Sequence, residues 1–446
     1  FDSYQMGENI FITGPGGSGK SALIREIMRD AKKRGKSAQV CAMTGTAAVL
    51  LQCNAKTIHS WGGIGLACGE KLAVANKVNK SRFKKKNWQM VDLLIIDEVS
   101  MMSVKIFELL DMTARLCRKN TKPFGGIQVI FSGDFYQLPP VGNDGEPETV
   151  QFCFESPIWG KIFPTQIQLK QIFRQNDLTY KKILNQIRIG RITKSTVETL
   201  KKYVDRSVEN GEKILPTVLY PTKRKVDAIN SASLNGLKGD EFVHDFSMAT
   251  RDEMPYNDKR ADAMTELFSQ DQKDREYKYM ADNVNFEKRL VLKEGAQVMC
   301  VVNLDMDSST PICNGSQGVV VRFEPDNMPI VRFKNGAECK ITPHVWQSET
   351  IPSVGIKQIP LILSWAITIH KSQGSSLDMA EIDVGSGIFE CGQTYVALSR
   401  LRSIDGLYLK SFDPSKIIIN LKVREFYNNL TNGNVGSTTN SIGGTC

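Results

Sequence analysis

The chain has 446 residues, of which 41% are hydrophobic and 24% charged, and its 57 Lys and Arg exceed its 48 Asp and Glu by nine charges. This length predicts two to four domains with cores of their own, and the composition excludes a disordered or collagen-like chain. The longest apolar stretch, 361–369, is far too short to span a membrane. The positive charge permits a polyanionic partner without requiring one. The ten cysteines include no Cys-x-x-Cys pair, so we expect no zinc site and a reducing, intracellular compartment, without distinguishing nucleus, mitochondrion, bacterial cytoplasm or viral factory.

The first third of the chain alternates strand and helix patterns. Residues 10–13 form an apolar run, and 22–31 carry apolar residues at helical spacing. Further β-rich runs follow at 39–44, 91–97 and 127–132, separated by helix-compatible segments. This order predicts an α/β domain with a parallel sheet over residues 1–165, with a small insertion at about 62–88.

The alternation of strand and helix patterns occurs again later in the chain. Apolar runs at 218–220, 361–366, 380–384 and 407–409 predict a second α/β domain made of residues 166–240 and 356–430. Between these parts, 241–355 contains short β-rich runs with Asn-Gly turns at 314–315 and 335–336, which predicts a small inserted β-barrel. Residues 431–446 are rich in Gly, Ser, Thr and Asn and predict a flexible tail.

The loop after the first predicted strand matches the phosphate-binding loop pattern: Gly14, Pro15, Gly16, Gly17, Ser18, Gly19, Lys20 and Ser21. Glycines let backbone N–H groups approach phosphate oxygens, and the following helix adds a favourable field. Lys20 is predicted to contact the β- and γ-phosphates, and Ser21 to bind Mg²⁺. A glycine-rich turn that binds nothing is the alternative, and the strand before and helix after the loop argue against it.

Two other strands end in polar residues. Asp97 and Glu98 follow the apolar run 93–96, so we expect Asp97 to hold Mg²⁺ and Glu98 to polarise the attacking water. By itself, such an acidic pair is often a helix N-cap. Gln137 follows the run 127–132 and could sense the γ-phosphate, although the two prolines after it also fit a solvated turn.

A basic run in the predicted insertion has two interpretations. Phe83 and Trp88 are interleaved with Lys77, Lys80, Arg82, Lys84, Lys85 and Lys86. Basic side chains with aromatic residues between them could contact DNA phosphates and bases. A solvated surface loop is an equally good interpretation of the same residues.

Longer motifs resemble one known family. The sequence is similar to the petite-integration-frequency (Pif-one) family of DNA helicases, in the superfamily-one B group. The resemblance is carried by residues 108–115 (Glu-Leu-Leu-Asp-Met-Thr-Ala-Arg), 118–120, 122–128, 133–135, 137–141, 171–175, 314–318, 369–374 and 395–400. These blocks lie in the expected order over most of the chain.

The resemblance implies two tandem RecA-like P-loop domains, with the β-barrel inserted in the second. It also implies a set of site residues. ATP and Mg²⁺ would be handled by Lys20, Ser21, Asp97, Glu98, Gln137, Arg174, Gln373, Gly374 and Arg400, and single-stranded DNA by Thr44, Gly45, Thr57, His59, His370, Lys371 and Ser372. One departure stands out: the family places an adenine-recognising glutamine well upstream of the loop, whereas Gln5 lies too close to Gly14 to match, so we expect a truncated chain.

The function implied by the resemblance is an ATP-dependent DNA helicase. The family unwinds forked or tailed duplexes in the 5′-to-3′ direction, and G-quadruplexes and RNA–DNA hybrids are further substrates. It implies no membrane association, and a monomer or a weak DNA-induced dimer. An RNA helicase, a translocase without unwinding activity and a non-motor ATPase switch are the alternatives that the sequence leaves open.

Overall fold

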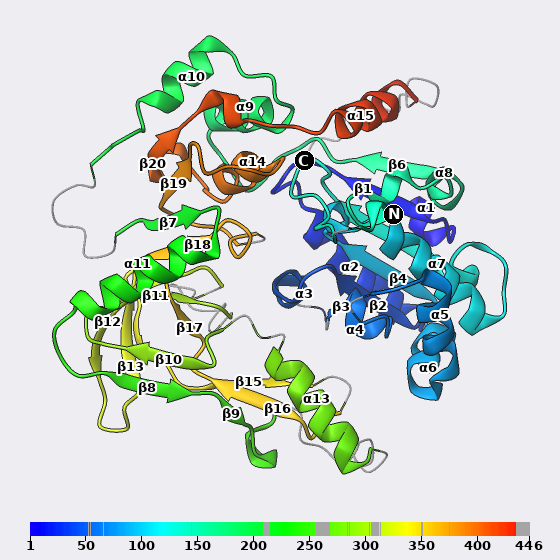
Figure 1. The fold of residues 1–446 in the computed structure, drawn as a ribbon, viewed down its shortest axis with the longest axis horizontal. Helices are drawn as coiled ribbons and strands as arrows, with labels where there is room; N and C mark the ends of the chain where they lie inside the picture. Colours follow the sequence, from blue (N-terminus) through cyan, green and yellow to red (C-terminus); the bar gives the residue numbers. More distant parts are fainter. Residues whose placement is uncertain are drawn as a thin grey trace.

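The computed structural model describes residues 1–433 with short gaps, and Figure 1 shows two α/β domains beside a β-rich region. The residues that it leaves undescribed are 52, 54, 66, 144, 208–214, 256–267, 283, 285, 303, 305–311, 313, 349–350, 374 and 434–446. The predicted tail at 431–446 lies outside the described residues, except for its first three positions, which end helix α15 (Leu421–Gly433).

The first domain is built on a six-stranded parallel sheet in the order β3-β2-β4-β5-β1-β6. Its strands are β1 (Ile10–Thr13), β2 (Ala38–Ala42), β3 (Lys56–Thr57), β4 (Leu93–Asp97), β5 (Gln128–Gly133) and β6 (Thr165–Gln168). The four strands predicted here from apolar runs are confirmed, while β6 carries the sheet three residues past the predicted boundary at 165. Successive residues of β1 and β4 enter different cores, because side chains alternate between the faces of a strand.

Helices cover both faces of this sheet (Figure 1). They are α1 (Asp2–Gln5), α2 (Lys20–Lys33), α3 (Gly45–Leu51), α4 (Ile58–Trp61), α5 (Lys71–Lys80), α6 (Arg82–Met90), α7 (Val104–Arg118) and α8 (Trp159–Ile162). An aromatic cluster that includes Phe107, Phe131 and Trp159 fills one core, with ring centroids 5.5–6.2 Å apart. Such aromatic pairs contribute packing beyond their buried area.

The predicted insertion forms helices α5 and α6, which pack on α7. Trp88 on α6 is fully buried against Trp61, with ring centroids 4.8 Å apart, and its indole N–H donates to the carbonyl of Gly62. Phe83 on the same helix is 45% exposed. Trp88 therefore cannot stack on a DNA base, because it belongs to the domain core.

The second domain has a four-stranded parallel sheet in the order β18-β7-β19-β20. Its strands are β7 (Thr217–Tyr220), β18 (Ala366–Thr368), β19 (Ala380–Val384) and β20 (Leu407–Phe412), and its helices are α9 (Leu178–Arg188), α10 (Lys194–Lys201), α11 (Lys223–Gly236) and α14 (Gln393–Leu398). Three of the runs, 218–220, 380–384 and 407–409, are confirmed as strands of this sheet. The run 361–366, however, is divided between two sheets, because the chain leaves one at Leu363 and enters the other at Ala366.

The inserted region contains three open sheets, in the orders β14-β13-β12-β11-β17, β10-β8 and β15-β16-β9. Its elements are β8 (Phe242–Asp245), β9 (Ser247–Met248), α13 (Gln270–Asp282), β10 (Arg289–Leu292), β11 (Gln297–Cys300), β12 (Gln317–Phe323), β13 (Pro329–Phe333), β14 (Glu338–Lys340), β15 (His344–Gln347), β16 (Gly355–Gln358) and β17 (Leu361–Leu363). The predicted closed barrel is not found in the described part of the chain. Strands β14 and β17 remain the edges of the largest sheet, with no pairing between them to close it.

Helix α15 leaves the second domain and packs on the first. Val423 and Tyr427 are buried in the first-domain core, and Phe426 lies 5.3 Å from Phe135 between ring centroids. The sequence placed residues up to 430 in the second domain, and the apolar face of α15 explains the difference, since it covers aromatic side chains of the first. No helix in the described ranges is both long and apolar enough to cross a membrane.

We expect Trp88→Ala to lower the free energy of unfolding of the first domain by about 3–5 kcal/mol, because it removes a large buried side chain and leaves a cavity. Phe83→Ala on the same helix is the matched control and should change stability little. Thermal melts followed by circular dichroism measure both variants. Equal melting temperatures would show that α6 is not part of the core.

Candidate nucleotide site at the domain interface

The phosphate-binding loop joins β1 to α2 as predicted. Gly17 has a φ of +79°, and a Cβ atom there would lie 2.4 Å from the Cβ atom of Arg174, so this position requires glycine. Lys20 begins α2, and its ammonium group donates to the carbonyls of Gly14 and Pro15 at 2.7 and 3.1 Å. Burial lowers the pKa of Lys20, while Asp134, Glu98 and Asp97 oppose that shift.

Asp97 and Glu98 lie at the carboxyl end of β4. Asp97 is 5% exposed, and burial raises the pKa of its carboxyl group. Burial, followed by the Asp97 charge, raises the pKa of Glu98 to about 7, and the charges of Lys20 and Arg400 act in the opposite direction. Glu98 has a left-handed backbone with a φ of +56°, which is uncommon for a residue with a side chain and typical of functional turns.

Two polar atoms of this site are buried without a hydrogen-bond partner among the described residues: Ser18 Oγ in the loop and Gln137 Oε1 after β5. Ser18 is 3% and Gln137 is 4% exposed. A buried polar atom without a partner is costly, so its presence indicates a place for a polar ligand. Ser21 is half-buried in the first turn of α2, where its hydroxyl group can join Asp97 as an oxygen ligand.

The second domain contributes side chains to the same site. Gln373 Nε2 donates to Glu98 Oε2 at 3.2 Å. Arg174 donates to the carbonyl of Ser399 at 3.2 Å. Arg400 is 2% exposed and donates to the Val396 carbonyl and the Ser399 hydroxyl. The predicted Gly374 lies outside the described residues.

The two arginines are close enough to affect each other. Burial, followed by the charge of Arg174, lowers the pKa of Arg400 to about 9, and Glu98 opposes this shift. Burial also lowers the pKa of Arg174. Arg400 is buried and Arg174 is half-buried, and neither forms a hydrogen bond with a carboxylate among the described residues, which predicts an anionic ligand between them and the loop.

The sequence prediction missed Tyr395 and Phe173. The Tyr395 hydroxyl group, from α14, accepts a hydrogen bond from the Gly16 N–H at 2.8 Å. Phe173 is 61% exposed, and its ring lies 3.7 Å from the position that a Cβ atom on Gly19 would occupy. Both residues belong to the sequence blocks that contain the predicted arginines, 171–175 and 395–400. Their contact with the phosphate-binding loop is visible only in the tertiary structure.

A buried ion pair beside the site joins the two domains. Arg188 at the end of α9 donates to both carboxylate oxygens of Asp134 at 2.7 and 2.8 Å. Its guanidinium group lies 4.6 Å from the ring centroid of Tyr136 and 5.2 Å from that of Tyr427. The Tyr427 hydroxyl group also bonds Thr13 at 2.5 Å, so α15 reaches the end of β1.

The predicted DNA contacts of the first domain follow its parallel strands. Thr44 and Gly45 follow β2, and the hydroxyl group of Thr44 accepts from the Ala47 N–H. Thr57 caps α4 by accepting from the Ser60 N–H. His59 is half-buried on α4, and burial lowers the pKa of its ring.

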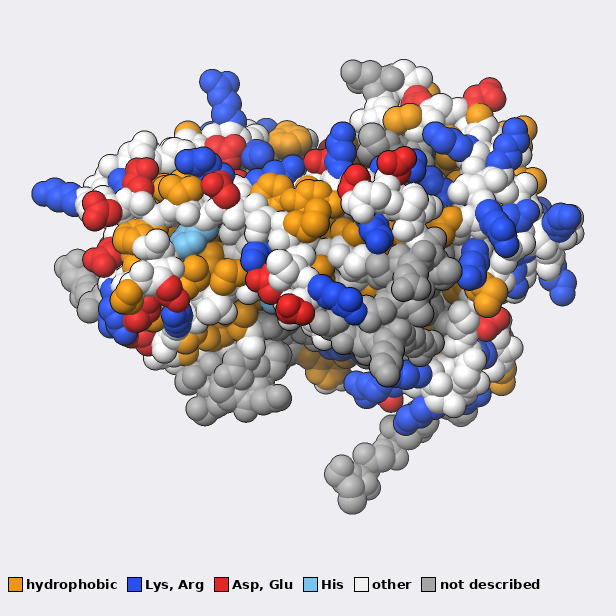
Figure 2. Space-filling model, turned by 90° about the horizontal axis from the view of Figure 1, so that it is seen from below, with side chains coloured by type: hydrophobic (Ala, Val, Ile, Leu, Met, Phe, Trp, Pro, Cys, Tyr) orange, Lys and Arg blue, Asp and Glu red, His pale blue; other side chains and the backbone are white. Residues whose placement is uncertain are grey.

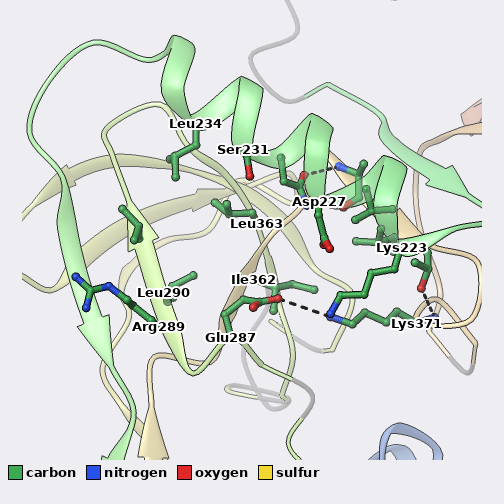
Figure 3. A pocket seen from close by; sticks show the side chains of 16 residues that line it. Lys223, Asp227, Ser231, Leu234, Glu287, Arg289, Leu290, Ile362, Leu363 and Lys371 are labelled. Atoms are coloured by element: carbon green, nitrogen blue, oxygen red, sulfur yellow. Dashed lines mark hydrogen bonds and ion pairs between the residues drawn. The ribbon is translucent and has the colours of Figure 1, made fainter.

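The equivalent residues of the second domain follow β18. His370 and Lys371 are exposed, whereas Ser372 is buried and donates to the carbonyl of Ile369. Lys371 lines a cavity of about 320 Å³ between α11 and the inserted strands, where it faces Glu287 at 3.8 Å (Figure 3). Lys371 thus stands where the second domain meets the inserted region.

Lys and Arg side chains are frequent on the right of Figure 2, the side where α5 and α6 lie in Figure 1. Lys84 of α6 also donates to the carbonyl of Gly63, so part of the basic run is structural. The surface-loop interpretation is wrong, because the run lies on helices α5 and α6. Lys77, Lys80 and Lys86 are exposed on these helices, and their contact with DNA stays a prediction.

A phosphate-binding loop, an acidic pair and two arginines, one in the loop after β6 and one after α14, define a two-domain P-loop protein with RecA-like domains, in which the candidate nucleotide site lies at the domain interface. The loop glycines and the unpartnered Ser18 and Gln137 fit a nucleotide phosphate, and the oxygens of Ser21 and Asp97 fit Mg²⁺.

Comparisons with known proteins assign the family. Residues 3–198 match the PIF1-like helicase model, and residues 281–323 match the 2B domain of DNA helicase Pif1. The ATP-dependent DNA helicase PIF1 of Danio rerio is 36% identical over 431 residues, which cover 95% of this chain and 62% of that protein. The chain therefore spans less than two thirds of the length of this relative.

Solved structures agree. The crystal structure of Pif1 helicase from Candida albicans has 33% sequence identity and a TM-score of 0.74, covering 96% of this chain and 97% of that one. Pif1 helicase from Bacteroides, in complex with ADP-AlF3 and single-stranded DNA, has 29% identity and a TM-score of 0.63, covering 96% and 94%. The chain belongs to the PIF1-like helicase family.

We expect Asp134→Asn to destabilise the protein by about 3–5 kcal/mol, because it leaves the buried charge of Arg188 without its partner. Arg332→Gln breaks an exposed pair with Glu338 and should leave the melting temperature nearly unchanged. Calorimetry of both variants provides the comparison. Similar small shifts in the two would mean that the buried pair does not hold the domains together.

Proposed function

We propose that the protein is an ATP-dependent DNA helicase that moves 5′-to-3′ on single-stranded DNA and unwinds forked or tailed duplexes. The observation that carries this proposal is the hydrogen bond between Gln373 and Glu98, because it brings the second domain onto the carboxylate that would activate water. A site completed by both domains changes the relation between them when nucleotide binds and leaves. Family membership supports DNA as the track.

The residues divide the chemistry of hydrolysis. Lys20 and the loop N–H groups hold the phosphates, and Gln137 and Gln373 orient the water that Glu98 activates. Arg174 and Arg400 stabilise negative charge that develops on the γ-phosphoryl group. Mg²⁺, held by Ser21 and Asp97, would neutralise phosphate charge.

We also propose that the Phe173 ring stacks on the base of the bound nucleotide. Its exposed ring borders the first turn of α2, beside the loop that would hold the phosphates. Aromatic faces stack on any base, so the ring would contribute affinity with little base selectivity. Loss of the ring should therefore weaken binding of ATP and GTP alike.

The DNA track would cross the carboxyl ends of both sheets. Thr44, Gly45, Thr57 and His59 mark it on the first domain, and His370 and Lys371 on the second. Because Gln373 lies three residues after His370 and contacts Glu98, a change at the nucleotide would reach the strand through one short segment. If the two domains weaken their contacts with the DNA strand in turn as ATP binds and is hydrolysed, the protein would move along the strand.

Strand displacement with 5′- and 3′-tailed duplexes tests this function. We expect unwinding of the 5′-tailed substrate only, and Glu98→Gln should bind ATP and DNA normally but neither hydrolyse nor unwind. Lys20→Ala is the control that should lose nucleotide affinity as well. Unwinding by Glu98→Gln would contradict an ATP-driven motor, as would ATP turnover that is equal with and without single-stranded DNA. A preference for duplexes with RNA tails would mean that the motor moves on RNA.

We expect Arg400→Ala to lower DNA-stimulated ATP turnover by about 10³-fold, because it removes a cation that stabilises the transition state. ATP affinity should change only severalfold. Arg402→Ala, at an exposed side chain two residues away, is the matched control. Steady-state ATPase assays with and without oligonucleotide measure the effect, and normal turnover by Arg400→Ala would remove it from the mechanism.

A further inference from the structure

Tyr395 is a second-domain side chain that touches the phosphate-binding loop directly. It is 3% exposed, and its hydroxyl oxygen accepts from the Gly16 N–H at 2.8 Å. Burial raises the pKa of Tyr395 to about 12, so the hydroxyl group keeps its hydrogen at neutral pH. No acceptor for that hydrogen is present in the part of the chain that the structure describes.

Gly16 lies close to three side chains that come from outside the first sheet. A Cβ atom on Gly16 would lie 3.5 Å from the Tyr395 hydroxyl, 3.6 Å from Ser399 Oγ and 3.8 Å from Arg174 Nη1. Ser399 in turn accepts from Arg400 Nη2 at 2.8 Å. The Tyr395 hydroxyl group therefore belongs to the same layer as the two arginines.

In the proposed function, this layer would face the γ-phosphate of the bound nucleotide. Arginines delivered across an interface act on the γ-phosphoryl group, and buried neutral donors that point at the same charge strengthen its stabilisation. A phenol that already accepts from the loop and still has a hydrogen to donate can bridge the loop and a phosphate oxygen.

We propose that the Tyr395 hydroxyl group donates a hydrogen bond to the γ-phosphate of the bound nucleotide and lets the second domain distinguish a triphosphate from a diphosphate. This inference rests on the proposed function, because it requires the loop to bind ATP. Tyr395 is thus a nucleotide-binding residue on α14, and Arg400 follows two residues after the end of that helix. The α14 helix would be positioned by the γ-phosphate and released when that phosphate leaves.

Equilibrium binding to the full chain tests the assignment, with a non-hydrolysable ATP analogue and with ADP, both in the presence of Mg²⁺. Tyr395→Phe keeps the ring and removes one hydroxyl group. We expect its affinity for the triphosphate analogue to fall at least about tenfold, the scale of a hydrogen bond to a charged group, while ADP affinity stays within about twofold.

Tyr180→Phe is the matched control. Its hydroxyl group is also buried and donates to the Leu398 carbonyl of α14 at 2.7 Å, away from the loop. This variant should lower the melting temperature and leave the ratio of the two nucleotide affinities unchanged.

Several outcomes would overturn the inference. The first is an unchanged ratio of triphosphate to ADP affinity in Tyr395→Phe. The second is tighter triphosphate binding by Tyr395→Phe, which would mean that the hydroxyl group competes with phosphate for the Gly16 N–H. The third is the same change of ratio in Tyr180→Phe. A wild-type chain that binds neither nucleotide would overturn the proposed function itself. A wild-type chain that binds both, with an unaltered ratio in the variant, overturns only the role of Tyr395.

Discussion

The buried ion pair between Asp134 and Arg188 is the contact on which the relation between the domains depends. Asp134 ends the central part of the first sheet, Arg188 ends α9, and Tyr136 and Tyr427 lie against the guanidinium group. A buried pair contributes little net stability, since burying both charges offsets their attraction, but its bidentate geometry selects one arrangement. In the same arrangement, Tyr395 and Arg174 contact the phosphate-binding loop.

Given this arrangement, the nucleotide site is a shared structure. Glu98 directly follows β4 of the first sheet and accepts a hydrogen bond from Gln373, and its charge acts on both Arg174 and Arg400. Arg400 is buried and Arg174 half-buried, and their hydrogen-bond partners among the described residues are backbone carbonyls and a hydroxyl group, so the site offers positive charge to an anion. Binding energy at the phosphates can then be converted into domain closure.

The inserted region returns to the second domain through one short segment. Strand β17 pairs with β11 in the insertion, and β18 begins three residues later in the parallel sheet. The buried Ser364 carbonyl accepts from Thr217 of β7, which holds this crossing in place. The cavity beside Lys371 marks where the inserted region and the second domain meet.

Most strands of the two parallel sheets, the phosphate-binding loop and the acidic pair were predictable from the sequence, because they depend on local patterns: apolar runs buried on both faces, glycines at positive φ, and polar residues at strand ends. The sequence also placed Gln373, Arg174 and Arg400 through motif resemblance. Only the tertiary structure decided that α15 returns to the first domain, that 361–366 serves two sheets, that the insertion is open and that Trp88 is core. Tyr395, Phe173 and the Asp134–Arg188 pair belong to the same group. Their roles depend on contacts between side chains that are far apart in the sequence. Local sequence patterns do not indicate which distant segments will be in contact.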